Sequence, residues 1–294
     1  MSEAIQHIVD GAALGSFYAI FALGIALIFG IMRLVNFAHG ELIMVGAFAI
    51  YLTRTLAWPL IVLAAIGASV AIALITERVA FRPVRGASPA TLLITSFAVS
   101  YLLQSGARLV FTSLPKSADI HPLLRRSFTV GDVFVSWLTV FTIAVTAGLL
   151  VALAFFLRAT PMGTQMRAAA EDFDAARLCA VDANRVVAVS FALSGLLAGA
   201  AALLIVGETG TLFPTMGLTP VLFGFTAAVI GGMGSLPGAV LGGYVLGAGS
   251  TVLTNTLPHG VAPFRDALLF GLVMLVLTVR PEGILRARGT VTRV

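Results

Sequence analysis

Long apolar runs are the feature that most restricts what this chain can fold into. A helix needs roughly 20 apolar residues to cross a bilayer. Nine segments are candidates: 8–31, 42–53, 60–79, 90–111, 134–157, 186–206, 218–232, 237–256 and 267–279. The second, seventh and ninth are short, so we predict eight or nine membrane-spanning helices. A membrane barrel would instead show short segments of alternating polarity, and the fold is therefore all-α.

The composition agrees with an integral membrane protein. Hydrophobic residues make up 59% of the 294 positions and charged residues 11%, whereas a soluble domain carries about 25% charged residues. The links between the apolar runs are too short to hold a separate domain. We therefore predict one polytopic domain over residues 1–294, with a cytoplasmic loop at 158–185.

The arginines predict the orientation. All but one of the 18 basic residues are arginines. They fall in loops, which fits the positive-inside rule better than a nucleic-acid-binding face. Three clusters, at 78–85, 158–185 and 280–293, can all be cytoplasmic, because two and then four predicted spans separate them. Nine spans place the N-terminus outside and eight place it inside. The outer loop 112–133 fits less well, since it holds Lys116, Arg125 and Arg126.

The loop from 160 to 185 has the pattern of an amphipathic helix. One stripe contains small and apolar residues at three- and four-residue spacing: Met166, Ala169, Phe173, Ala176 and Ala180. Charged pairs three or four residues apart, Arg167 with Glu171 and Asp174 with Arg177, are expected to meet on the solvent side. Two interpretations stay open at this point: a solvated helical loop, or a helix that docks its stripe into a groove of a cytoplasmic partner.

Two apolar regions are interrupted and predict broken helices near the middle of the membrane. Such breaks are tolerated only inside protein or beside a water-filled cavity, and in transporters they indicate the pathway. The candidate pathway residues are Asn36, His39 and Glu41 in the first break and Gly231, Gly232 and Gly234 in the second. The alternative is that His39 and Glu41 lie at the membrane surface and cap a helix or pair with Arg33.

Other residues predict close packing between helices or give no sign of a catalytic or metal-binding site. Glycines four residues apart, such as Gly11 with Gly15 and Gly243 with Gly247, predict closely packed helices. We expect Glu77 and Arg78 to form a pair at the membrane surface, and Glu208 and Asp266 to mark span ends. The single cysteine, four scattered histidines and lack of a nucleophile–base pair or metal-ligand spacing predict no catalytic residue and no metal site.

Four motifs in order along the chain resemble the permease subunits of bacterial ABC importers for branched-chain amino acids, specifically the shorter of two paralogous permeases. They are NFAHGE at 36–41, RAAAED at 167–172, GGMGS at 231–235 followed by Gly238 and Ala239, and RPEGI at 280–284. One departure lies at 179–182, where the family carries a glycine followed by an aliphatic residue. Relatives import urea, short amides and other small solutes, which leaves the substrate open.

The resemblance implies a non-catalytic, multi-pass subunit of the bacterial inner (plasma) membrane. Its partners would be a second homologous permease, two cytoplasmic ATPases and a periplasmic or lipid-anchored solute-binding protein. It would hold no cofactor, because ATP binds the ATPases. The expected ATPase-coupling residues are Arg167, Ala170, Glu171, Asp172 and Phe173. A rival function is a stand-alone secondary transporter or channel that uses Glu41 or Glu208 as a proton-linked carboxylate.

Overall fold

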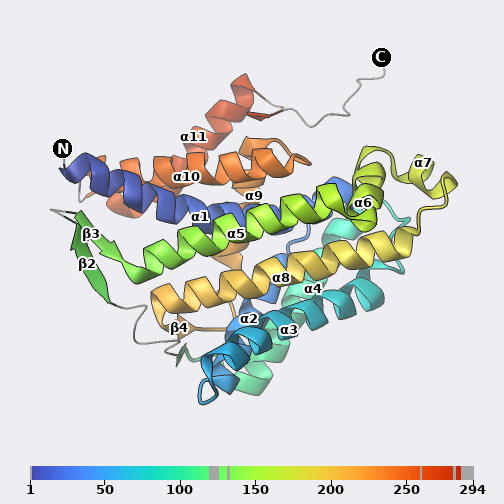
Figure 1. The fold of residues 1–294 in the computed structure, drawn as a ribbon, viewed down its shortest axis with the longest axis horizontal. Coiled ribbons are helices and arrows are strands. Elements are labelled where there is room, and N and C mark those ends of the chain that lie inside the picture. Colours follow the sequence, from blue (N-terminus) through green and yellow to red (C-terminus); the bar gives the residue numbers. More distant parts are fainter. Residues whose placement is uncertain (1, 119–125, 131–132, 259, 281–282, 286–294) are drawn as a thin grey trace.

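The computed structural model describes residues 2–118, 126–130, 133–258, 260–280 and 283–285. All nine predicted segments are helical (Figure 1): α1 Ser2–Met32, α2 His39–Thr53, α3 Trp58–Thr76, α4 Pro89–Phe111, α5 Trp137–Ala159, α8 Ala183–Thr209, α9 Leu218–Gly231, α10 Leu236–Thr256 and α11 Arg265–Val279. Within the described residues, seven helices are long and apolar enough to cross a membrane. The helices α2 and α9 are short, as predicted, whereas a 3-10 turn at Ala262–Phe264 lengthens the ninth segment to 18 residues.

Smaller elements lie in the connections. A π-helical turn, η1 (Glu77–Phe81), continues α3, and two short helices, α6 (Pro161–Glu171) and α7 (Phe173–Leu178), precede α8. Strand β1 (Lys116–Ser117) pairs antiparallel with β4 (Thr211–Leu212), and β2 (Ser127–Val130) pairs antiparallel with β3 (Val133–Ser136). These short strands lie in the connections between helices. Strand β3 also takes the first three residues of the predicted segment 134–157, and α5 forms the rest of it.

Polar caps explain where several helices begin. The hydroxyl of Ser88 accepts a hydrogen bond from the Thr91 amide and precedes Pro89, a residue suited to a first helical position. Ser235 does the same for α10, because its hydroxyl accepts from the Gly238 amide at 3.1 Å. Each cap lies where a loop meets an apolar run, and it marks the residue at which the helix begins.

Two ends of the molecule are distinguished by the contacts that join its loops. At one end the Gln6 side chain makes two hydrogen bonds with the backbone of Phe134, and β1 pairs with β4. At the other end Arg85 donates to the side chain of Asn184, and α6 and α7 lie beside them (Figure 1). Consecutive long helices run alternately between these ends.

The arginine-rich loops gather at one of these ends. The clusters at 78–85 and 158–185 meet through Arg85 and Asn184. The C-terminal segment comes to the same end, where the Ile284 amide donates to the carbonyl of Ile230. The remaining arginines of the third cluster, Arg286, Arg288 and Arg293, lie outside the described residues, as do Arg125, Pro281 and Glu282.

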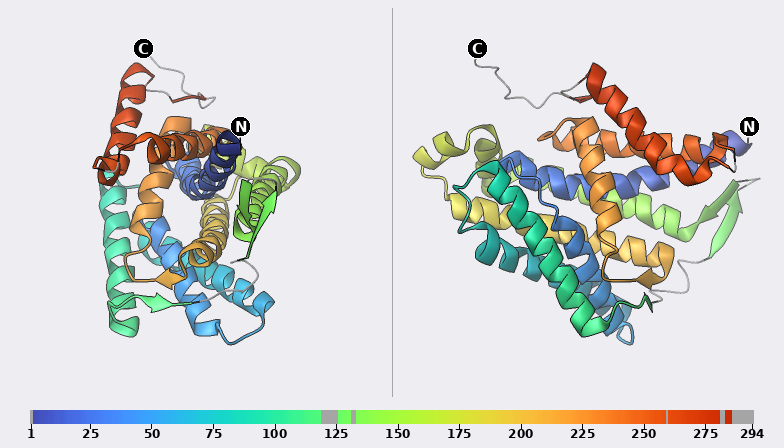
Figure 2. Two further views of the ribbon diagram at one scale, coloured as in Figure 1. Left: turned by 90° about the vertical axis from the view of Figure 1, so that its left-hand side faces the viewer. Right: turned by 180° about the vertical axis from the view of Figure 1, so that it is seen from behind.

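Glycines allow the central helix α1 to pack closely on α10, as their spacing predicts. A Cβ atom on Gly15 would overlap Tyr244, and one on Gly243 or Gly247 would overlap the backbone of α1. On the other side, α8 packs on α3 through Gly195 and Gly199 in the same way. Helix α1 is therefore the centre of the bundle, and α4 and α11 lie along one outer edge (Figure 2).

Candidate functional site

The first predicted break is present between α1 and α2. The helix α1 ends at Met32, and Arg33 has a left-handed backbone with φ of 53°. Asn36 is buried, and its side-chain oxygen accepts a hydrogen bond from the Ala38 amide at 3.1 Å. This bond holds the non-helical segment in the conformation that lets α2 begin at His39.

The side chain of His39 is buried between α1 and α8 and does not reach the molecular surface. Its ring is fully buried against Gly24, where a Cβ atom would overlap the imidazole. The Ser194 hydroxyl donates to the Gly24 carbonyl at 3.1 Å and lies 2.9 Å from Nδ1 of His39. The single hydroxyl hydrogen of Ser194 can serve only one of these two acceptors, so the donor in the contact with His39 depends on the tautomer of the imidazole. His39 Nε2 has no partner among the described residues.

Glu41 is also buried at mid-depth, with 1% of its surface exposed. Its Oε1 accepts hydrogen bonds from the Ser100 hydroxyl at 2.9 Å and the Gln104 amide at 2.8 Å. Both donors lie on α4, and Ser100 is at the centre of that helix. Oε2 of Glu41 has no hydrogen-bond partner in the described part of the chain. The interpretation that His39 and Glu41 lie at the membrane surface, capping a helix or pairing with Arg33, does not fit this geometry.

Aromatic rings join the same break to two other helices. The ring of Phe37 stacks on Phe97 of α4, with ring centres 4.5 Å apart, and lies 5.9 Å from the ring of Phe225 of α9. Gly40 and Gly217 are in close contact, since a Cβ atom on either would overlap the backbone of the other. The first turn of α2 therefore lies against the residue that precedes α9.

The second predicted break follows α9 and lies at the arginine-rich end. Gly232 and Gly234 have φ values of 104° and 91°, a region that favours glycine. The amides of Ile284 and Leu285 donate to the carbonyls of Ile230 and Gly231 at 2.7 and 3.0 Å, which satisfies carbonyls at the end of α9. The glycine-rich and C-terminal motifs are thus in contact, a relationship that the sequence did not reveal.

The two sets of predicted pathway residues occupy different depths, which corrects the expectation that both breaks lie near the middle of the membrane. His39 and Glu41 contact Ser194 and Ser100 near the middle of α8 and α4, whereas Gly234 lies beside Gly30 near the end of α1. Residues of α1, α9 and the second break lie together without room for a water molecule between them: Ile25, Ala26, Phe29, Phe225, Ala228, Met233 and Gly234.

The segment 160–185 contains two helices, which corrects the expected single helix. Asp172 has an extended backbone between α6 and α7, and its carboxylate accepts from the amides of Asp174 and Ala175 at 3.0 and 2.9 Å. The chain therefore turns at a capping residue. The predicted charged pairs do not form among the described residues, and Arg167 instead donates to Thr164.

The apolar stripe of this segment packs inside the chain. Met166, Ala169 and Ala176 are buried in its hydrophobic core, so they cannot enter a partner's groove, and Ala180 is exposed. Among the expected coupling residues, Arg167, Glu171 and Asp172 are exposed, and Ala170 and Phe173 are half-buried. Leu178, outside the predicted apolar stripe, is 90% exposed at the end of α7.

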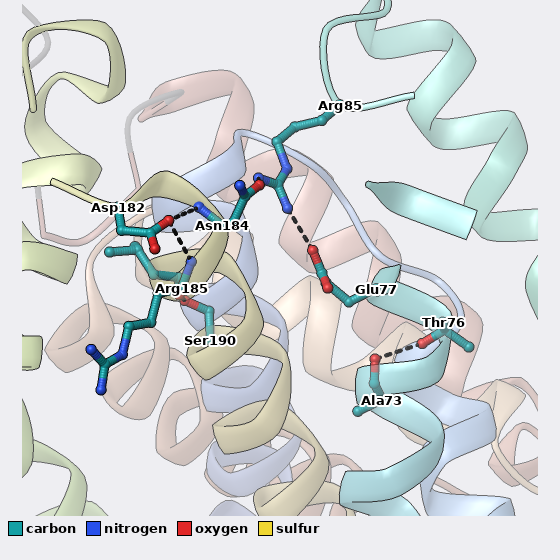
Figure 3. Close-up of polar contacts among 9 residues, drawn as sticks. Ala73, Thr76, Glu77, Arg85, Asp182, Asn184, Arg185 and Ser190 are labelled. Atoms are coloured by element: carbon teal, nitrogen blue, oxygen red, sulfur yellow. Dashed lines mark hydrogen bonds and ion pairs between the residues drawn. The ribbon is translucent and has the colours of Figure 1, made fainter. Parts of the chain in front are cut away.

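Arg85 joins this segment to the end of α3 through a partly buried ion pair and a hydrogen bond (Figure 3). Glu77 accepts from Arg85 at 2.5 Å, which corrects the expected pairing of Glu77 with Arg78. Arg85 also donates to Asn184 at 2.9 Å, and Asp182 caps the first turn of α8 through the amides of Asn184 and Arg185. Burial lowers the pKa of Arg85, while the Glu77 carboxylate opposes that shift.

Comparison with known proteins gives consistent matches over nearly the whole chain. The family model described as the permease component of the branched-chain amino acid transport system matches residues 7–278. The high-affinity branched-chain amino acid transport system permease protein BraD of Pseudomonas aeruginosa is 35% identical over 297 aligned residues, which cover 96% of this chain and 95% of that protein. The corresponding LivH proteins of Salmonella typhimurium and Escherichia coli are each 33% identical with the same coverage.

Proposed function

Because the chain belongs to the family of permease components of branched-chain amino acid transport systems, we propose that it carries branched-chain amino acids across the bacterial membrane as part of an ABC importer. The observation that carries this proposal is the match to permeases of high-affinity branched-chain amino acid transport over 96% of the chain. The subunit is a non-catalytic, multi-pass membrane component, and ATP hydrolysis belongs to its partners.

In the proposed topology all nine helices cross or enter the membrane, and the N-terminus is outside. The alternation of the helices between two ends supports nine passages. The gathering of the arginine-rich loops at the end that holds α6 and α7 supports a cytoplasmic location for that end. The short helices α2 and α9 would be completed by the non-helical segments that precede them.

The proposed ATPase contact is the exposed side of α6 and α7. Its residues would be Arg167, Glu171 and Asp172, with the half-buried Ala170 and Phe173 at its edge and Leu178 as an added apolar contact. Movement of these helices would reach the spans through two links. The buried Met166 and Ala169 pack on the bundle, and Arg85 connects the start of α8 to Glu77 at the end of α3.

The proposed mechanism is alternating access. ATP binding closes the ATPases, α6 and α7 move with them, and the spans open outward to receive the amino acid from a periplasmic or lipid-anchored binding protein. Nucleotide can drive this change only through different affinities for the two states. The proposed pathway passes Asn36, His39 and Glu41 at mid-depth and Gly231, Gly232 and Gly234 near the cytoplasm, beside a second homologous permease and two ATPases.

Uptake by intact cells tests which solute the importer carries. Cells with and without the gene for this chain would be compared for uptake of labelled leucine, isoleucine and valine, with urea and acetamide measured in parallel. The proposal predicts loss of branched-chain amino acid uptake at low external concentration and unchanged urea and acetamide uptake. Loss of urea or acetamide uptake alone would show that this importer type serves another solute.

A further inference from the structure

Glu41 is a buried carboxylate of which only one oxygen is used within the chain. Oε1 accepts two hydrogen bonds from α4, and Oε2 has no partner among the described residues. A buried carboxylate oxygen without a partner is costly. Ionisable groups at membrane depth are retained for a function by default. The unused oxygen is therefore available to a group that is absent when the chain is alone and closed.

The helix that covers Glu41 is lightly attached to the rest of the bundle. Only four of the 23 residues of α4 are buried, namely Leu92, Ser96, Val99 and Ser100. Its side-chain hydrogen bonds to α2 are those from Ser100 and Gln104 to Glu41. In Figure 2, α4 lies at the outer edge of the molecule. Separating α4 from α2 would unstack Phe97 from Phe37 and Phe111 from Phe48, and it would uncover the carboxylate.

One face of α4 carries polar residues, whereas exposed apolar residues such as Ile94, Leu102 and Leu109 occupy other positions of the helix. Tyr101, beside the central Ser100, is 69% exposed. Gln104 is half-buried and Arg108 is exposed, and the spacing of these three residues places them along one side of the helix. Polar groups at this depth face protein or a water-filled cavity. This face of α4 therefore borders the pathway and the second permease.

An apolar surface adjoins the carboxylate. The rings of Phe37, Phe97 and Phe225 are in contact, and they come from the segment before α2, from α4 and from α9. Phe97 lies one helical turn from Ser100, which is bound to Glu41. An ammonium acceptor next to aromatic rings matches the chemistry of an amino acid with an apolar side chain.

We propose that Oε2 of Glu41 accepts the α-ammonium group of the amino acid in transit, while the cluster of Phe37, Phe97 and Phe225 contacts its apolar side chain. The contact forms when α4 moves away from α2, and it is lost when α4 returns and its hydrogen bonds close the site. This inference rests on the proposed transport of branched-chain amino acids.

The test uses the complete importer in proteoliposomes, with leucine supplied on its binding protein. Glu41→Gln removes the charge and keeps the shape and an oxygen that Ser100 can bond. It is expected to lower leucine uptake per ATP hydrolysed about tenfold or more, as expected for loss of a charge-assisted hydrogen bond. Glu208→Gln, an exposed site at the end of α8, is the matched control and should retain uptake.

A second variant distinguishes the proposed substrate contact of Glu41 from a purely structural role of that residue. Ser100→Ala combined with Gln104→Leu removes the bonds to Oε1 and keeps the carboxylate, so it should retain more uptake than Glu41→Gln. Equal or greater loss in the double variant would overturn the proposal. Normal coupling in Glu41→Gln would also overturn it and leave the importer function intact. Failure of the unaltered importer to move leucine would instead contradict the proposed function itself.

A chemical measurement independent of transport probes the charge of the site. Tyr101→Cys in a Cys179→Ser background would be treated with positively and negatively charged water-soluble methanethiosulfonates in the complete importer. The proposal predicts faster reaction with the cationic reagent, protection by leucine, and loss of the charge preference when Glu41→Gln is added. No reaction with either reagent, or a preference unaffected by Glu41→Gln, would contradict it.

Discussion

The Arg85 guanidinium donates to Glu77 at the end of α3 and to Asn184 in the first turn of α8. The two acceptors are more than a hundred residues apart in sequence, and the segment 160–185 ends where α8 begins. A movement of α6 and α7 would therefore reach α3 through a partly buried ion pair and through the packing of the glycine-lined face of α8 on α3.

Arg85→Met should destabilise the protein and weaken this connection. Removing Arg85 leaves the buried Glu77 carboxylate uncompensated, at a cost of about 1–3 kcal/mol because the arginine itself is only partly buried. Arg78→Met is the control, because it removes the same charge from an exposed residue of η1. Thermal unfolding in detergent should show a lower midpoint for Arg85→Met alone. Equal midpoints would show that the pair contributes nothing to stability.

Gly24→Ala should disturb the mid-depth site through His39. The added Cβ would overlap the buried imidazole, and overpacking of this kind costs about 1–3 kcal/mol. Gly67→Ala on α3 is matched to it, since a Cβ there meets no atom within 4 Å. Unfolding midpoints and leucine uptake of both variants test the packing. A stable, active Gly24→Ala protein would contradict the described contact between α1 and His39.

Asp172→Ala should fray α7 and weaken ATPase binding. The carboxylate caps α7 through two amides, and loss of such a cap costs about 1 kcal/mol. Asp174→Ala removes the same charge from an exposed residue that provides no cap. The amount of ATPase that copurifies with each variant is the measurement. Equal losses would indicate that charge, and not the α7 conformation, controls binding.

Glu171→Lys should reduce coupling between ATP hydrolysis and transport without preventing membrane insertion. Its side chain is exposed at the end of α6, where a reversed charge would face the ATPase. Glu208→Lys changes the net charge equally at the opposite end of the molecule. We expect about a tenfold loss of uptake per ATP for Glu171→Lys, the size of effect seen for a central interface residue. Normal uptake would exclude the docking role.

The sequence was sufficient to locate the helices, because uncharged apolar runs of this length have few other structures available. It also identified the two breaks from glycines and polar residues. The prediction that both lie near the middle of the membrane is wrong for the second, because depth depends on contacts between distant helices, such as those of His39 with Gly24 and Ser194 and of Gly234 with Gly30. Glu77 was assigned the wrong partner since the chain turns after η1 and brings back Arg85.

The segment 160–185 shows a different limit. Helical spacing favoured one continuous helix, although Asp172 is a good capping residue and Phe173 can begin a second helix. The same apolar stripe is compatible with a partner's groove or with the chain's own core. The choice depended on the helices against which α6 packs, namely α1, α5 and α8, and local periodicity does not contain that information.

Leucine uptake by proteoliposomes that contain the complete importer tests the central claim most directly. The vesicles would enclose ATP or a non-hydrolysable analogue, and the leucine-loaded binding protein would be added outside. Accumulation of leucine with ATP and none with the analogue is the predicted result. Equal accumulation without ATP hydrolysis, or by this chain reconstituted alone, would contradict an ATP-driven permease and indicate a secondary transporter.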